Sequence, residues 1–255
     1  MRFIDKILDL TVFFSFDSYG FRRHKKYFDN EDLSQIASRK ICLVTGANNG
    51  IGFYIAEKLA SNGAKVFMLC RNEIKGKIAV ERLKLKGYDV ILKIVDVSDS
   101  KSIKNFIQNF SENKVDVLIH NAGLIPNKRV FTRDGVEVAF ATHILGPHLL
   151  TKLLIPKLTG GRIIWVVSGG MYLVKFSFIK AMGKRGKYKG VSSYAQTKRG
   201  QVILSEIWSE RLKQSNILVS SMHPGWVKTP GLQKSLPLFS GYLSVRLRTL
   251  AEGAD

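Results

Sequence analysis

The chain has 255 residues, of which 45% are hydrophobic and 24% charged, and this composition excludes a disordered, collagen-like or disulfide-rich protein. The length fits one domain with a sizeable core. Basic residues number 40 against 20 acidic ones, so the net charge is +20. Such an excess indicates anionic ligands or surfaces and carries no information about the fold.

Residues 1–39 are expected to form an N-terminal arm, and residues 40–255 the domain proper. The arm contains a basic cluster at residues 22–26, and its apolar positions fit one helical face only loosely. It therefore either packs on the domain or anchors the protein at a membrane interface. Its apolar residues include Phe3, Ile4, Leu10, Phe13, Phe14, Phe16, Phe21 and Phe28.

The two cysteines, Cys42 and Cys70, lie in apolar, strand-like runs, which favours buried free thiols in a reducing compartment over a disulfide or metal site. No apolar run is expected to reach the ~20 residues that span a bilayer. Asp5 and Asp9 interrupt the apolar start of the chain, unlike a signal peptide. We expect a cytoplasmic protein, with peripheral contact to an intracellular membrane through the basic arm as an open alternative.

From residue 40, short β-branched runs alternate with amphipathic stretches, a pattern that predicts βαβ units and a doubly wound parallel sheet of the Rossmann type. Six strands are expected, and a seventh edge strand is expected to be missing, as in a fragment, a short isoform or a degenerating copy. The predicted strands are 41–44, 65–69, 90–95, 115–119, 162–167 and 217–221. The predicted helices are 51–62, 73–86, 99–112, 135–158 and 194–214.

The first predicted strand ends in the sequence TGANNGIG, residues 45–52. Three glycines between a strand and a helix allow a tight turn and a close approach of the backbone to a pyrophosphate. The helix that follows offers its free N–H groups and positive dipole end to the phosphates.

Two residues that follow the second and third strands indicate which dinucleotide binds. Arg71 stands where NAD-binding proteins hold an acidic residue for the ribose 2′-OH, so it favours NADP(H) over NAD(H) through its 2′-phosphate. Asp96 can accept a hydrogen bond from the adenine amine, or it can serve as a helix cap.

Tyr194 and Lys198 lie four residues apart, on one face of a predicted helix. A nearby cation stabilises a phenolate and is expected to lower the pKa of Tyr194. Ser168, after the fifth strand, can orient a carbonyl oxygen that the tyrosine protonates during hydride transfer. No metal site is expected.

With the segments HNAG (120–123), VVSGG (166–170), YAQTK (194–198) and HPGWVKT (223–229), the chain resembles the short-chain dehydrogenase/reductase family over residues 40–255. The resemblance implies that Tyr194 is the general acid/base, that Lys198 holds the nicotinamide ribose and that Ser168 polarises a carbonyl substrate. It implies a cofactor site lined by Gly46, Asn49, Gly50, Ile51 and Gly52 at the pyrophosphate, Asp96 and Val97 at the adenine, Asn121, Ala122 and Gly123 at the adenine ribose, and Pro224, Gly225, Val227 and Thr229 at the nicotinamide.

Two positions depart from the family pattern. His120 replaces an asparagine in the HNAG segment, which we expect to be tolerated. His143 replaces the asparagine that, in the family, seats a water in the proton relay from the lysine. His143 is expected to be either a member of that relay or a satisfied core histidine.

Residues 138–205 contain no acidic residue and 11 Lys or Arg, several of them clustered between Ser168 and Tyr194 in a solvated loop or a surface for anions. Nucleic acid is not expected, because no binding module accompanies the charge. The sequence predicts an NADP-dependent oxidoreductase that interconverts a small carbonyl compound and its alcohol. One alternative is a dinucleotide-binding homologue with impaired or no catalysis, with membrane-surface association left open. Another is a scaffold that uses the basic arm at a membrane surface.

Overall fold

The computed structural model describes residues 7–9, 12–27, 33–184, 186–229, 241 and 244–255. Within these residues, six parallel strands form one sheet in the order β3-β2-β1-β4-β5-β6. The chain order therefore reverses between β1 and β4, which is the usual ligand-binding point of a doubly wound sheet. The strands are β1 (Ile41–Thr45), β2 (Lys65–Cys70), β3 (Val90–Ile94), β4 (Val117–His120), β5 (Arg162–Val166) and β6 (Leu218–Met222).

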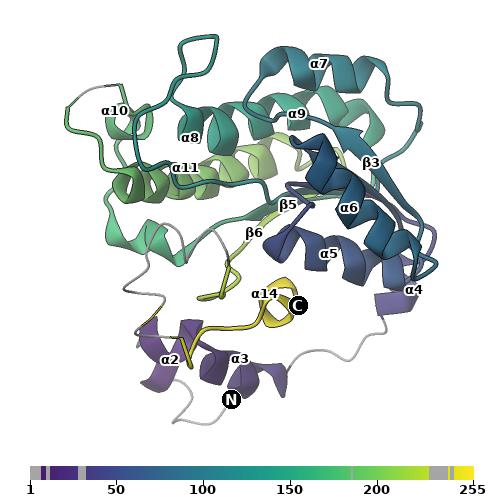
Figure 1. The fold of residues 1–255 in the computed structure, drawn as a ribbon, viewed down its shortest axis with the longest axis horizontal. Coiled ribbons are helices and arrows are strands. Elements are labelled where there is room, and N and C mark those ends of the chain that lie inside the picture. Colours follow the sequence, from purple (N-terminus) through teal and green to yellow (C-terminus); the bar gives the residue numbers. More distant parts are fainter. Residues whose placement is uncertain (1–6, 10–11, 28–32, 185, 230–240, 242–243) are drawn as a thin grey trace.

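Helices cover both faces of the sheet (Figure 1). The longer ones are α5 (Gly50–Ser61), α6 (Glu73–Lys84), α7 (Ser100–Gln108), α9 (Gly146–Leu154) and α11 (Gly190–Arg211). The shorter ones are α2 (Val12–Phe16), α3 (Ser18–Lys25), α4 (Leu33–Ala37), α8 (Val138–Phe140), α10 (Phe178–Ala181) and α14 (Leu250–Ala254), with a π-helix η1 (Ala141–Leu145) and the 3-10 helices η2 (Ile155–Lys157) and η3 (Gly169–Leu173).

Alternate residues of each central strand enter two separate cores, because successive side chains of a strand point to opposite faces. In β1, Leu43 packs into the core under α7, α9 and α11, which also contains the fully buried Trp165 of β5. Cys42 and Val44 pack into the core under α5 and α6. Both faces of the central strands are covered, so β1, β2 and β5 are largely apolar, as buried parallel strands usually are.

The predicted α/β fold and its six strands are confirmed, each within a few residues of its predicted bounds. Both cysteines are free and buried, as expected, and burial raises the pKa of Cys42 to about 12. The predicted helix at 135–158 is wrong in one respect, because it is divided into α8, η1, α9 and η2. Gly146 explains the division in part: a Cβ there would lie 1.7 Å from the carbonyl oxygen of Val97, so the chain must pass very close to that loop.

The expectation that no apolar run is long enough to span a bilayer is wrong by length and composition. Residues Val138–Lys157 form a run of 20 that meets both criteria. In this structure the run packs against the sheet, and just over half of its most apolar window is buried. Leu150 and Leu154 are completely buried there, which is the behaviour of a core helix.

The N-terminal arm packs against the C-terminal segment, and the two lie side by side in Figure 1. Arg246 binds the carboxylate of Asp17 with its Nε at 2.9 Å and its Nη2 at 2.6 Å. Nε of Arg22 lies 3.9 Å from Oε1 of Glu252, and Nζ of Lys25 lies 3.7 Å from Oδ2 of Asp255. These contacts favour the interpretation of the arm as packed on the domain. Of the residues singled out in the sequence, Phe3, Ile4, Leu10, Phe28 and the side chain of Phe13 lie outside the described part.

Candidate active site

The residues predicted to bind cofactor and substrate follow the carboxyl ends of the six strands. Gly46 follows β1, Arg71 follows β2 and Ser168 lies just beyond β5. Because all six strands are parallel, these ends share one edge of the sheet, where ligands of such folds bind. The predicted site residues are thus gathered along this edge, with Tyr194 and Lys198 brought to it by α11.

The glycine turn after β1 has the geometry of a phosphate cradle. Gly46 has φ +67° and Gly50 has φ +58°, a left-handed conformation that favours glycine. A Cβ at Gly52 would lie 2.3 Å from Nδ2 of Asn121 and 2.6 Å from the carbonyl oxygen of Gly46, so no side chain fits there. A Cβ at Gly50 would meet nothing within 4 Å. The N-terminus of α5 is therefore open at Gly50, and the Asn49 side chain forms no hydrogen bond that caps it.

Thr45 and Asn121 hold this turn against the end of β4. The hydroxyl of Thr45 accepts hydrogen bonds from the backbone N–H groups of Asn121 and Ala122, both at 3.0 Å. The side-chain amide of Asn121 donates to the carbonyl of Thr45 at 2.9 Å. Because these contacts fix the path of both loops, the cradle is formed without a ligand.

Arg71 and Asp96 lie together at the expected adenine end. The side chain of Arg71 is 65% exposed, and its Nε lies 3.9 Å from Oδ2 of Asp96. Oδ1 of Asp96 accepts hydrogen bonds from the backbone N–H and the hydroxyl of Ser98. Val97 is buried beside them. Arg71 is thus free to turn toward an anion, while Asp96 is oriented by its own loop.

At the other end of the site, Ser168, Tyr194 and Lys198 converge. The side chain of Tyr194 hydrogen-bonds that of Ser168. Nζ of Lys198 lies 5.7 Å from the centre of the Tyr194 ring and donates to the carbonyl of Val166 at 2.8 Å. A Cβ at Gly123 would lie 3.6 Å from Nζ of Lys198, an ordinary contact distance, so the loop after β4 passes directly beside the lysine.

Burial has the largest influence on the pKa values of Tyr194 and Lys198. Lys198 is 3% exposed, and its loss of solvent lowers its pKa to about 7. Burial also raises the pKa of Tyr194, against which the hydrogen bond with Ser168 acts. The expectation that Lys198 lowers the pKa of Tyr194 is therefore wrong for the protein without ligand. The physical reason is that desolvation of the phenolate has the largest influence on this pKa and outweighs the hydrogen bond with Ser168.

His143 lies on the π-helix η1 and is completely buried. Its Nε2 accepts a hydrogen bond from the backbone N–H of Leu124 at 3.1 Å, which assigns the ring proton to Nδ1. Nδ1 lies 2.8 Å from Oγ1 of Thr197, which in turn donates to the carbonyl of Tyr194 at 2.9 Å. Burial and the nearby Lys198 hold the pKa of His143 well below its usual value. Both ring nitrogens are engaged, which favours the interpretation of a satisfied core histidine.

His120, the last residue of β4, is buried. Its Nε2 lies 2.8 Å from Oγ1 of Thr151, and its ring lies 4.4 Å from that of Trp165, centre to centre. Within the described part of the chain its Nδ1 is buried and has no hydrogen-bond partner. Burial lowers its pKa to about 3, so the ring is neutral.

The segment after β6 is held by contacts that the sequence did not reveal. Pro224 accepts a hydrogen bond from Nη1 of Arg248 at 3.1 Å, and a Cβ at Gly225 would clash with the same arginine side chain. Val227 is buried, and its side chain packs against Gly253 of α14. Thr229, the last residue of the predicted set, is half-buried at the end of the described segment. Pro224 and Gly225 thus lie next to Arg248, which no motif had singled out.

This constellation defines a dinucleotide-binding protein of the Rossmann type. The family model described as short chain dehydrogenase matches residues 40–237. The chain belongs to this family of oxidoreductases.

Among known proteins, dehydrogenase/reductase SDR family member 12 of Bos taurus is 40% identical over 242 residues, covering 92% of this chain and 76% of the relative. Human retinol dehydrogenase 12 is 32% identical over 225 residues, covering 85% and 71%. The structure of an uncharacterised protein from Mycobacterium paratuberculosis is similar with a TM-score of 0.71 and 27% identity, over 85% of this chain and 74% of that one. L-sorbose reductase from Gluconobacter frateurii, solved with NADPH and L-sorbose, has a TM-score of 0.70 at 24% identity, over 85% and 87%, and shows the fold.

Proposed function

We propose that this protein is an NADP(H)-preferring oxidoreductase that interconverts a carbonyl compound and its alcohol, with Ser168, Tyr194 and Lys198 as its reaction centre. The observation that carries the proposal is the convergence of these three side chains at the carboxyl end of the sheet. A phenol that hydrogen-bonds a serine hydroxyl, beside a lysine whose pKa is about 7, is suited to proton transfer at neutral pH.

The residues fit a dinucleotide. The open N-terminus of α5 at Gly50 and the glycine-only contact at Gly52 leave room for a pyrophosphate. Arg71 would bind the 2′-phosphate and Asp96 the adenine, with Val97 packed behind it. Gly46, Asn49 and Ile51 would line the phosphates, and Asn121, Ala122 and Gly123 the adjoining ribose. When bound, the nicotinamide supplies the hydride.

The protein's own groups would do the remaining work. Ser168 donates a hydrogen bond to the carbonyl oxygen and orients it toward Tyr194. Tyr194 gives its phenolic proton to that oxygen as negative charge develops there, and takes it back in the reverse direction. Lys198 would leave the carbonyl of Val166 to bind the nicotinamide ribose, and its ammonium form would then stabilise the phenolate. Pro224, Gly225 and Thr229 would bound the nicotinamide from the β6 side.

The alternative is a homologue that binds the dinucleotide with little or no turnover. Its support is His143, whose two ring nitrogens are occupied by Leu124 and Thr197 and which therefore offers no free nitrogen to a relay from Lys198.

Titration of the purified chain with NADPH and with NADH, followed by NADPH oxidation against a panel of aldehydes and ketones, separates these possibilities. Tight NADPH binding with turnover of at least one carbonyl supports the proposed reaction. Tight binding without any turnover supports the alternative. Absence of binding to either dinucleotide would refute both.

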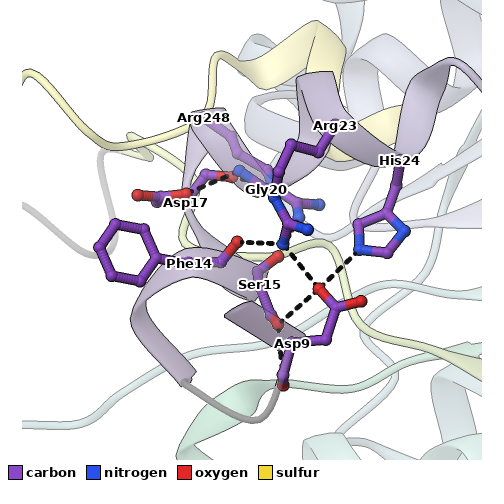
Figure 2. Close-up of polar contacts among 8 residues, drawn as sticks. All are labelled: Asp9, Phe14, Ser15, Asp17, Gly20, Arg23, His24 and Arg248. Carbon is purple, nitrogen blue, oxygen red and sulfur yellow. Dashed lines mark hydrogen bonds and ion pairs between the residues drawn. The ribbon is translucent and has the colours of Figure 1, made fainter. Parts of the chain in front are cut away.

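Peripheral contact with a membrane through the basic arm stays a prediction. Of the cluster, Arg23 is buried and binds Asp9 and the carbonyl of Phe14, as Figure 2 shows. His24 contacts the same aspartate at 2.9 Å. Arg22, Lys25 and Lys26 of the cluster remain exposed, and the first two lie near carboxylates of the C-terminal segment.

A further inference from the structure

One residue of the N-terminal arm contacts both segments that border the reaction centre. The ring of Phe16 lies 4.3 Å from that of His223, edge to face, and 6.1 Å from that of Trp226, measured between centres. It also stacks on Tyr172 at 5.9 Å. In addition, the backbone N–H of Trp226 donates to the carbonyl of Phe16 at 2.7 Å. Phe16 therefore bridges the chain that follows β5 and the chain that follows β6.

The ring of Phe16 also lies close to the chain that follows Ser168. Gly169 directly follows Ser168, and a Cβ there would lie 3.1 Å from Cε2 of Phe16 and 2.8 Å from Nε2 of His223. Within the described residues, both ring nitrogens of His223 are buried and lack a hydrogen-bond partner. The arm thus reaches within one residue of Ser168, where it presents an aromatic surface.

The position of Phe16 is fixed by the residue that follows it. Asp17 is completely buried; one carboxylate oxygen accepts from the backbone N–H of Gly20 and the other binds Arg246. Arg248 donates to the carbonyls of Asp17 at 3.1 Å and Ser15 at 2.8 Å, and to that of Pro224 beyond β6. Figure 2 shows Arg248 reaching the turn between α2 and α3 at Asp17. These buried and directional contacts hold the arm against the domain.

We propose that Phe16, together with Tyr172 and Trp226, forms an apolar subsite for the part of the substrate beyond its carbonyl group. Asp17, Arg246 and Arg248 hold Phe16 in place at this subsite. The proposal rests on the proposed function, because the location of the substrate follows from the roles of Ser168 and Tyr194. It predicts that the site distinguishes substrates by the apolar chain they carry, and that the arm supplies part of this discrimination.

The test compares propanal with octanal as substrates of the full chain with NADPH. In Phe16→Ala, we expect the KM for octanal to rise about 3- to 10-fold, which corresponds to the loss of one aromatic contact. The kcat/KM for propanal should change by less than about twofold. Phe16→Leu keeps part of the apolar surface and should fall between. Tyr19→Ala is the matched control, because this arm residue is 52% exposed and its ring contacts Phe14 and Arg23 instead.

Binding of 1-octanol to the protein with NADP⁺, measured by calorimetry, gives a readout that needs no turnover. Weaker octanol binding in Phe16→Ala, with an unchanged NADP⁺ affinity, supports the subsite. If no aldehyde is reduced in the same preparation, the proposed reaction is refuted while the subsite is still supported. Equal losses for propanal and octanal, or no loss of octanol binding in Phe16→Ala, would overturn the proposal.

Discussion

The edge of the sheet that we propose binds ligands has a proposed cofactor end and a proposed substrate end, and the two are built in different ways. At the cofactor end, the glycine turn, Thr45 and Asn121 follow neighbouring strands, and their constraints come from close backbone contacts such as that of Gly52. At the substrate end, Pro224 and Trp226 are held by Phe16 and Arg248 from opposite ends of the chain. The first end depends on residue size at fixed positions, whereas the second depends on charged and aromatic contacts across more than 200 residues. The two ends should therefore respond to different kinds of substitution.

The largest effect is expected at the reaction centre, where the two ends meet. Tyr194→Phe removes the proton donor and should lower turnover by about 10²- to 10⁴-fold, the usual contribution of general acid–base catalysis. NADPH affinity should stay within about twofold, because the hydroxyl is not a phosphate ligand. Steady-state kinetics and a cofactor titration check both. A variant that retained more than half of the activity would contradict the role of Tyr194.

At the substrate end, Asp17→Ala removes the carboxylate that caps α3 at the N–H of Gly20 and binds Arg246, which is 40% exposed. It should lower the free energy of unfolding by about 2 kcal/mol, the cost of losing a buried helix cap and a charge-assisted hydrogen bond. Asp17→Asn keeps an acceptor for the N–H of Gly20 and should lose less. Urea unfolding measures the difference. Glu210→Ala is the control, since that carboxylate is 78% exposed and its ion pair with Lys213 contributes at most about 1 kcal/mol. A loss below 1 kcal/mol in Asp17→Ala would mean that the arm is not held by this pair.

Buried neutral histidines make the stability depend on pH. The pKa of His120 is lowered to about 3 and that of His143 well below its usual value, both by burial, so the unfolded chain binds protons below about pH 6.5 that the folded chain does not. Above about pH 6.5, these two histidines do not make the free energy of unfolding depend on pH. As the pH falls below about 6.5, they should lower the free energy of unfolding by up to about 2.7 kcal/mol per pH unit.

Urea unfolding between pH 7 and pH 5 tests this slope. His143→Asn should halve the part of the slope that these two histidines contribute. The reason is that the unfolded chain of the variant then binds one proton fewer relative to the folded chain. A slope that is the same in the wild type and the variant would show that His143 is not neutral in the folded protein.

The smallest effect concerns the cofactor end and its specificity. Arg71→Ala should weaken NADPH binding by roughly 10- to 150-fold, the equivalent of one charge-assisted contact of ~1.5–3 kcal/mol, and leave NADH nearly unchanged. Lys77→Ala removes an exposed cation from the helix that follows and serves as the control. Equal losses for NADPH and NADH, measured by fluorescence titration, would show that Arg71 does not contact the 2′-phosphate.

The contrast between the two ends also explains what the sequence could predict. The strands and the glycine turn depend on local patterns of apolar residues and glycine, and these were placed within a few residues of their observed positions. The roles of Asp17 and Arg248 depend on a contact across 231 positions, for which no local pattern exists. Val227 shows the same limit: it lies in a family segment, yet its side chain packs against Gly253. The protonation of Tyr194 was also missed, because desolvation depends on the packed environment and not on the spacing of the two residues.

The contact between Asp17 and Arg248 also sets an order of events during synthesis. Asp17 leaves the ribosome long before its partners, and at about 5–20 residues per second the 231 positions that separate it from Arg248 take roughly 10–50 s to translate. During that interval the carbonyl of Asp17 has no Arg248 to accept from and its carboxylate has no Arg246 to bind. The contacts that hold Phe16 beside His223 and Trp226 therefore form only after almost the whole chain has been translated.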